Sequence, residues 1–286
     1  MNDKQKILHL WKWPAIILLV IGCVMLIRHC CIGSYRISTE SMEEALHKGD
    51  YVLVNKLSLP DNPGRNRVVL FRSPLSQDAV KRPLFVSRCI GLPGDTIRIS
   101  PRGYQVNGKP IPRSPLSLNT FYIKRSDREQ LEKIMSQLEI TQKKMNQIPY
   151  GYTFTLTTFE EYLIREELPE GLDMELVEDQ SEAYSLVVPQ KGKPYRLNEA
   201  ALIACREIIL AETNGKAVFK DGLLYINNKE MPYFLFEQDY YWLLSDNPNE
   251  AIDSRQLGFV PEDLIVGNVW FCWYSKDKKN QFKFVY

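Results

Sequence analysis

The chain has 286 residues and a formal net charge of +1 at neutral pH. Hydrophobic residues make up 44% and charged residues 25% of the sequence, which is typical of folded globular proteins and too apolar for a disordered chain. This length is enough for one large domain or two small ones. Because basic and acidic residues nearly balance and no block of like charge occurs, we expect no nucleic-acid partner.

An apolar run near the N-terminus extends from Trp13 to Ile27 and is bounded by charged residues on both sides. We predict that residues 13–32 form a single transmembrane anchor in the cytoplasmic (inner) membrane, so the lipid bilayer is one expected partner. The lysines before the run favour a cytoplasmic N-terminus over residues 1–12 and an extracytoplasmic main domain. A cleaved secretory signal is the alternative, although the residues after Ile27 lack the small side chains of a cleavage site.

Much of the remaining chain has the residue types of β-strands. β-Branched and aromatic residues gather between segments rich in glycine and proline, as strands and turns require. Strands are predicted at residues 51–54, 67–71, 84–90, 240–244 and 267–274.

The middle of the chain carries helix signals instead. Residues 126–129 and 157–160 have the Ser/Thr-x-x-Glu pattern of a capping box, and each precedes apolar residues at helical spacing. A third helix is predicted over residues 198–212. Helices that interrupt β-structure in this way favour an insertion that grows from a surface connection.

The predicted fold is therefore mostly β, a twisted antiparallel β core with an α+β insertion, behind one N-terminal transmembrane helix. The core is expected in two parts, residues 33–118 and 232–286, and the inserted second domain over residues 119–231.

Four short segments occur in a fixed order along the chain. They are ISTESM at 37–42 with GD at 49–50, RVVLF at 67–71, RCIGLPGD at 88–95, and SDN at 245–247 followed by DSR at 253–255. Together with the apolar N-terminal run, they resemble the segments of bacterial type I signal peptidase, the membrane serine protease that removes signal peptides from exported proteins. The resemblance implies a signal-peptidase-like fold, and it implies exported preproteins or their signal peptides as partners.

The resemblance also implies roles for individual residues. In that family a serine attacks the peptide carbonyl and a neutral lysine takes its proton, because a serine hydroxyl is a poor nucleophile without a base. The nucleophile falls on Ser41, and the Thr39 hydroxyl is implied as an oxyanion donor. Residues implied to organise the site are Met42, Asp246, Asp253 and Arg255. No cofactor is expected, and no metal site, because the six cysteines lack metal-ligand spacing.

The chain departs from the family pattern at the base. The position of the general-base lysine is occupied by Ser87, and the adjacent Arg88 cannot replace it because a guanidinium keeps its proton. The hydroxyl that supports the lysine falls on Ala251, and the usual glycine before Asp246 is Ser245. We expect the side chain at residue 87 to point at the Ser41 hydroxyl with nothing to accept its proton.

Three other residues near the motif are alternative bases, namely His47, Lys48 and Lys81. Two functions therefore stay open. One is a signal-peptidase-like serine endopeptidase that acts on signal peptides. The other is a catalytically silent paralogue that binds signal peptides or a partner protein, with a lysine-bearing paralogue as one candidate. A self-cleaving repressor is a weaker third reading, because the chain has an anchor and lacks a DNA-binding helix-turn-helix.

Two further groups of residues have alternative interpretations. The aromatic residues of segment 233–242 are expected in a core, and those of segment 270–274 either in the core or at the lipid interface. Cys89, Cys205 and Cys272 are expected as small buried apolar residues, with a Cys89–Cys272 disulfide as the alternative.

Overall fold

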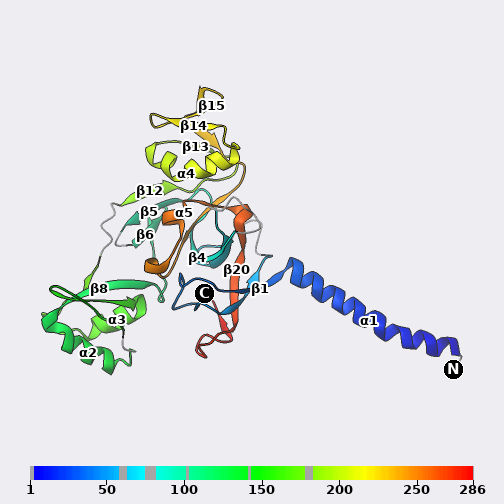
Figure 1. Ribbon diagram of the computed structural model, residues 1–286, viewed down its shortest axis with the longest axis horizontal. Helices are drawn as coiled ribbons and strands as arrows, with labels where there is room; N and C mark the ends of the chain where they lie inside the picture. Colours follow the sequence, from blue (N-terminus) through cyan, green and yellow to red (C-terminus); the bar gives the residue numbers. More distant parts are fainter. Residues whose placement is uncertain are drawn as a thin grey trace.

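The computed structural model describes residues 3–57, 63–74, 82–100, 103–140, 143–177 and 183–285. Over this part of the chain the architecture is mostly antiparallel β with a few helices, which confirms that part of the predicted fold class. Figure 1 shows a central body with one lobe above it, a second lobe at its lower left, and a long N-terminal helix at its right.

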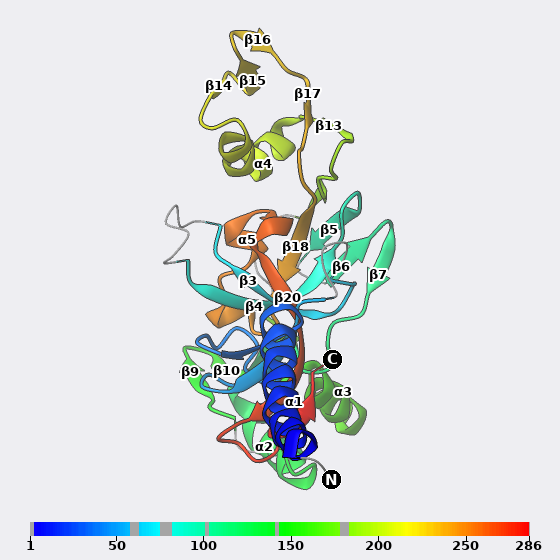
Figure 2. The ribbon, with the colours of Figure 1, turned by 90° about the vertical axis from the view of Figure 1, so that its right-hand side faces the viewer.

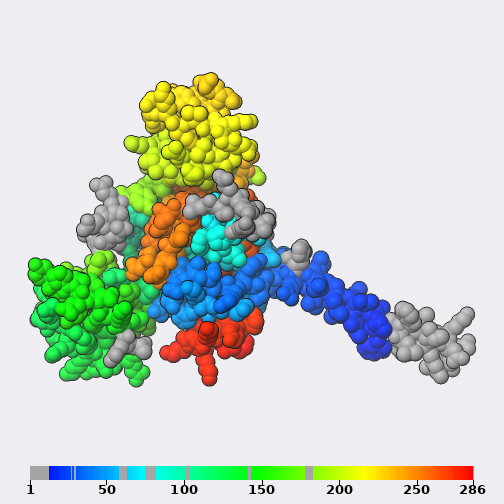
Figure 3. Space-filling view, viewed as in Figure 1, coloured from blue at the N-terminus to red at the C-terminus, as the bar shows by residue number. Residues whose placement is uncertain are grey.

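Helix α1 (Asp3–Cys30) extends away from the body (Figures 1 and 3). Its apolar side chains from Trp13 to Leu26 are largely open to solvent, and Leu18 for example is 69% exposed. Within the residues that the structure describes, no helix combines the length and the hydropathy that crossing a membrane requires. The anchor over 13–32 therefore stays a prediction.

The central sheet has the strand order β1-β2-β20-β3-β4-β18-β19, and β21 pairs with β20. Its strands are β1 (Ile32–Arg36), β2 (Tyr51–Asn55), β3 (Val68–Arg72), β4 (Leu84–Gly91), β18 (Tyr240–Leu244), β19 (Val260–Pro261), β20 (Ile265–Tyr274) and β21 (Lys283–Phe284). Four of the five predicted strands agree closely with β2, β3, β4 and β18, and the fifth lies within β20. Segments from both ends of the sequence thus alternate in one sheet, and residue 244 comes into register with residue 88.

The green lobe of Figures 1 and 2 is a small α+β unit that follows the first part of the core. It contains β8 (Leu118–Lys124), η1 (Arg125–Asp127), α2 (Arg128–Gln137), β9 (Asn146–Ile148), β10 (Gly151–Thr157), α3 (Thr158–Glu167) and β11 (Glu175–Leu176). Its apolar side chains form a hydrophobic cluster of their own, which includes Phe121, Leu131 and Phe154.

The upper, yellow lobe packs differently. It contains β13 (Pro194–Arg196), α4 (Glu199–Glu212), β14 (Ala217–Lys220), β15 (Leu223–Ile226), β16 (Lys229–Glu230) and β17 (Tyr233–Leu235). The cluster under α4 also includes side chains of β4, β18 and the hairpin sheet of β5 (Thr96–Ser100), β6 (Gly103–Val106), β7 (Lys109–Ile111) and β12 (Tyr184–Val187). Segment 119–231, predicted as one domain, therefore contributes side chains to two separate hydrophobic clusters. The predicted domain limits stay a prediction.

The helix starts differ in how well they were predicted. The capping box at Thr157 is present, because its hydroxyl accepts from the Glu160 N–H and the Glu160 carboxylate accepts from the Thr157 N–H. Asn198 caps α4 through the Ala201 N–H. The predicted box at Ser126 is wrong, because this residue lies in η1 and its hydroxyl donates to the Asp127 carboxylate instead.

The aromatic and cysteine interpretations are resolved for the described residues. In segment 233–242 the aromatic side chains are buried, except Tyr233, which is 51% exposed. In segment 270–274 the core interpretation is wrong for three side chains, since Trp270, Trp273 and Tyr274 are 48%, 38% and 43% exposed. Cys89, Cys205 and Cys272 are buried free thiols, so the alternative Cys89–Cys272 disulfide is not formed.

Candidate active site

Ser41 lies in a closed loop between β1 and β2. The loop is shut by backbone hydrogen bonds in which the Ile37 N–H donates to Asp50 and the Gly49 N–H donates to Ile37. Gly49 has φ +102°, a left-handed conformation that favours glycine. The apolar side chains of Met42 and Leu46 point into the core, where they are 1% and 0% exposed. Chain closure and burial together hold the Ser41 backbone in place.

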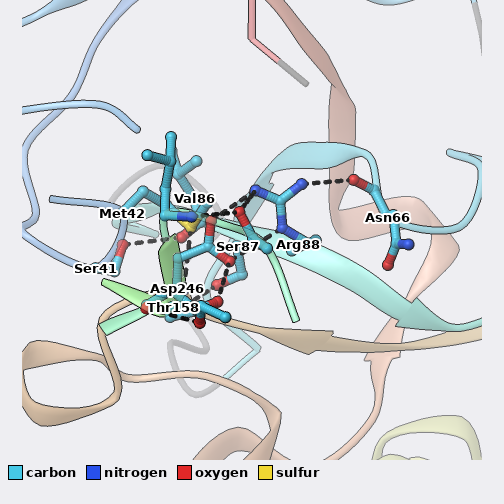
Figure 4. A network of polar contacts seen from close by, with 12 residues as sticks. Ser41, Met42, Asn66, Val86, Ser87, Arg88, Thr158 and Asp246 are labelled. Carbon is cyan, nitrogen blue, oxygen red and sulfur yellow. Dashed lines mark hydrogen bonds and ion pairs between the residues drawn. The ribbon is translucent and has the colours of Figure 1, made fainter. Parts of the chain in front are cut away.

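The Ser41 hydroxyl is buried and has two hydrogen-bond partners. Its Oγ donates to the Val86 carbonyl at 2.9 Å and lies 2.9 Å from Thr39 Oγ1. A hydroxyl has one hydrogen, so Thr39 is the donor in the second contact. Figure 4 shows the bond from Ser41 to the backbone of β4. An amide carbonyl is a very weak base, so the present contacts orient the hydroxyl without activating it.

Ser87 sits at the expected base position but does not contact Ser41. It is 0% exposed, and its Oγ lies 2.9 Å from the Oγ of Ser245. Neither Ser41 nor Ser87 hydrogen-bonds the other. The Ser87 hydroxyl pairs instead with the segment that follows β18, so the expectation that residue 87 points at the Ser41 hydroxyl stays a prediction.

A buried ion pair joins the same two segments. Arg88 donates to both carboxylate oxygens of Asp246, from Nε at 3.0 Å and from Nη2 at 2.6 Å, and to the carbonyl of Asn66 at 2.7 Å. Figure 4 shows the guanidinium between Asn66 and Asp246. The Asp246 N–H also contacts Met42 Sδ at 3.4 Å. Met42 and Asp246, both implied as organising residues, thus lie together.

The second implied pair, Asp253 and Arg255, supports the strand end that carries Ser245. Asp253 is fully buried, and its carboxylate accepts from the Ser245 N–H at 2.9 Å and from Arg255 Nη2 at 2.6 Å. Asp253 also begins helix α5 (Ser254–Leu257) with a capping box. The Asp253 carboxylate therefore fixes the backbone of Ser245 and the side chain of Arg255, and its role in the site is structural.

The alternative bases are engaged elsewhere or lie outside the description. His47 lies between the carboxylates of Glu43 and Asp277, at 3.4 and 3.6 Å. Lys48 pairs with Glu40 at 3.2 Å and its side chain is 61% exposed. Lys81 is outside the described residues. Among the residues that are described, no amine or imidazole hydrogen-bonds the Ser41 hydroxyl.

Two site contacts were not anticipated from the sequence. Asn247 donates from its N–H to the Ser41 carbonyl at 2.9 Å and from its side-chain amide to the Glu40 carbonyl at 3.0 Å. The sequence marked Ser245 as a departure from glycine but gave no partner for it. The Ser87–Ser245 pair joins residues that are 158 positions apart in the sequence, and Asn247 and Glu40 are 207 positions apart. Only the folded structure reveals contacts of this range.

A hollow of about 680 Å³ adjoins residues 245 and 246. Ser245 and Asp246 form part of its wall, together with polar residues of the hairpin sheet and the green lobe, such as Tyr104, Arg113 and Asn119. Ser41 does not line it. The hollow therefore adjoins the supporting residues and not the hydroxyl itself.

Comparison with known proteins gives a consistent result. A family model described as "Signal peptidase, peptidase S26" matches residues 10–159 and 213–274, which include every residue of the site. Signal peptidase I of Buchnera aphidicola subsp. Baizongia pistaciae is 26% identical over 268 residues, covering 90% of this chain and 74% of the relative. Signal peptidase I of Aquifex aeolicus is 25% identical over 259 residues, covering 90% of this chain and 81% of the relative. Signal peptidase I of Pseudomonas aeruginosa is 29% identical over 160 residues, covering 48% and 55% of the two chains.

Proposed function

Because the chain belongs to the signal peptidase family S26, we propose that it receives the signal peptides of exported preproteins at the Ser41 site and hydrolyses them very slowly or not at all. The observation that carries this proposal is the environment of the Ser41 hydroxyl. Its proton is held by the Val86 carbonyl, and the base position holds Ser87, whose hydroxyl is turned to Ser245. Loss of one member of a serine-protease triad lowers the rate about 10⁴- to 10⁶-fold, with the largest losses for the base and the nucleophile.

The binding part of the site supports retention of a peptide. Ser41, Thr39 and Asn247 are held by mutual hydrogen bonds and do not depend on a base. An extended peptide can add to exposed backbone beside a strand, where main-chain hydrogen bonds give affinity and shallow pockets select side chains. Substrates with small residues before the cut fit this mode. These contacts support the proposal that the site positions a signal peptide.

We further propose that the body lies at the outer face of the cytoplasmic membrane, with α1 as a single-pass anchor and its N-terminus in the cytoplasm. The apolar side chains of α1 are exposed along its described part. Trp273 Nε1 donates to Ser34 Oγ on β1, the strand that directly follows α1, and Trp270 is 48% exposed nearby on the same strand β20. Tryptophan side chains favour the membrane–water interface, which agrees with a bilayer at this end of the body.

A second candidate function is residual serine endopeptidase activity. The 2.9 Å contact between Thr39 Oγ1 and Ser41 Oγ favours it, because it places a hydroxyl donor beside the attacking oxygen, close to where the carbonyl oxygen of a substrate would become the oxyanion. One oxyanion donor typically contributes roughly 3 kcal/mol to the transition state, so some rate above the uncatalysed reaction survives without a base.

Cleavage and binding assays on full-length protein in detergent separate these functions. We expect a radiolabelled preprotein to be cleaved at the background rate by wild type and by Ser41→Ala alike, while both proteins bind a fluorescent signal peptide. Robust cleavage that Ser41→Ala abolishes would contradict the silent reading and show that another base is recruited. Absence of signal-peptide binding would contradict the proposal as a whole, and capture of a lysine-bearing paralogue would then test the partner-binding alternative.

A further inference from the structure

We propose that Ser245 is a positioning residue that holds the side chain of residue 87 away from Ser41 and keeps the site from regaining a base by the single exchange Ser87→Lys. The inference rests on the proposed function, since it concerns the same silent site. It gives one shared physical role to two departures from the family pattern, Ser87 in place of lysine and Ser245 in place of glycine.

The geometry of the hydroxyl pair carries this inference. Ser87 and Ser245 are 0% and 6% exposed, and their Oγ atoms are 2.9 Å apart. A lysine at position 87 in the same rotamer would put a methylene where Oγ now lies, and that methylene would meet Ser245 Oγ at 2.9 Å. This is shorter than the roughly 3.5–4.0 Å at which carbon atoms pack favourably. The amine would have to extend past a buried hydroxyl that already fills the space.

Ser245 has little freedom to give way. Its N–H donates to the buried Asp253 carboxylate at 2.9 Å, and the residues on both sides of it are fixed. Leu244 is in register with Arg88 on β4, and Asp246 holds the Arg88 guanidinium. The backbone at 245 is therefore held beside residue 87 from both directions, and removal of the Ser245 side chain opens the space that its hydroxyl now fills.

The chemistry then predicts what a repaired site needs. A lysine in this dry position loses its proton more readily than in water, because burial disfavours the charged form. The neutral Nζ would take the Ser41 hydroxyl proton while Oγ bonds to the peptide carbonyl carbon, and it would pass that proton to the departing amine nitrogen as the peptide bond breaks. The family resemblance implies that a hydroxyl in place of Ala251 would help to orient the amine.

The main test compares Ser87→Lys alone with Ser87→Lys/Ser245→Gly, in full-length protein, by initial rates of preprotein cleavage. The single variant is expected to stay within about tenfold of wild type, and the double variant to be about 100-fold faster, the lower end of what a general base contributes. Addition of Ala251→Ser should raise the rate further. The matched control is Ser87→Lys/Ser245→Thr, which keeps a hydroxyl and adds bulk, and it should remain slow.

The pH dependence distinguishes a restored base from a loosened structure. The rate of the double variant should increase with pH as the lysine loses its proton, and Ser41→Ala should abolish it. A Ser87→Lys variant that cleaves as fast as the double variant would overturn the inference. So would a folded variant with all three exchanges that is no faster than Ser87→Lys.

A stability measurement keeps the inference testable if lysine prevents folding. Methionine is unbranched and uncharged and is one atom shorter than lysine, and its Cγ would meet Ser245 in the same way, so Ser87→Met should lower the melting temperature, and Ser245→Gly should lower it less in that background than in wild type. Strictly additive shifts would contradict a shared space. These comparisons do not depend on whether the wild-type protein binds or cleaves signal peptides. A failure of this inference is therefore distinguishable from a failure of the proposed function.

Discussion

The Arg88–Asp246 ion pair should be the most sensitive polar contact of the site. In Asp246→Asn the guanidinium of Arg88 keeps the Asn66 carbonyl and the Ser114 hydroxyl but loses its countercharge. The two side chains are only 7% and 4% exposed, so water cannot replace the lost carboxylate charge. Breaking a buried pair from one side costs about 3–5 kcal/mol, which raises the unfolded fraction by roughly 10² to 10³ or more.

Urea titration followed by tryptophan fluorescence measures this loss directly. The matched control is Glu132→Gln in the pair of Arg128 and Glu132, whose side chains are 42% and 46% exposed, because exposed helix pairs contribute only about 0.3–0.5 kcal/mol. Signal-peptide binding should fall together with stability for Asp246→Asn only, since the backbone N–H of residue 246 contacts Met42 beside Ser41 and this segment loses its link to β4 when the ion pair is broken. A loss below about 1 kcal/mol for Asp246→Asn would refute the reasoning that this pair locks β4 to the segment after β18.

Three further predictions follow from other contacts. Burial raises the pKa of Cys272 from 9.0 to about 11, with Asp50 adding to the effect, so the stability of the folded state should be intact below pH 9 and fall as pH approaches 11. Urea titrations at these pH values should show a smaller fall in stability for Cys272→Ala than for wild type. An equal fall in both proteins would contradict this prediction. Lys143 bridges Glu44 and Glu160, at 3.4 and 3.1 Å. Lys143→Met should therefore speed amide hydrogen exchange of residues 43–46, with a loss of folding stability of no more than about 1 kcal/mol. Unchanged exchange would argue against docking of the green lobe by this bridge. Trp270→Ala should weaken binding of the protein to anionic lipid vesicles in a flotation assay while the melting temperature stays within about 2 °C, and full binding would argue against lipid contact at this strand.

The strands and most helices could be predicted because their signals are local. Runs of β-branched and aromatic residues mark β2 and β3 within a few positions, and the Thr157 capping box lies within one turn of its helix. Ser126 shows the limit of such a pattern, since an adjacent carboxylate at Asp127 competed for its hydroxyl. Local competition of this kind is not visible in spacing alone.

The residues of the candidate site were identified from the sequence, but their contacts were not. Ser41 and Ser87 were expected to face each other because both fall on motif positions. Their actual partners, the Val86 carbonyl and Ser245, depend on the register between β4 and a strand that begins far along the chain. The exposure of Trp270 and Trp273 likewise depends on which face of β20 other segments cover. Such information is non-local, and composition does not contain it.

The order of strands in the central sheet has a consequence for biosynthesis. Strand β20 lies between β2 and β3, so the β1–β2 pair and the β3–β4 pair cannot join one another until almost the last residues have been made. A nascent chain that ends before residue 265 therefore leaves the inner edges of both strand pairs open. The sheet that carries the Ser41 loop closes only once translation is almost complete.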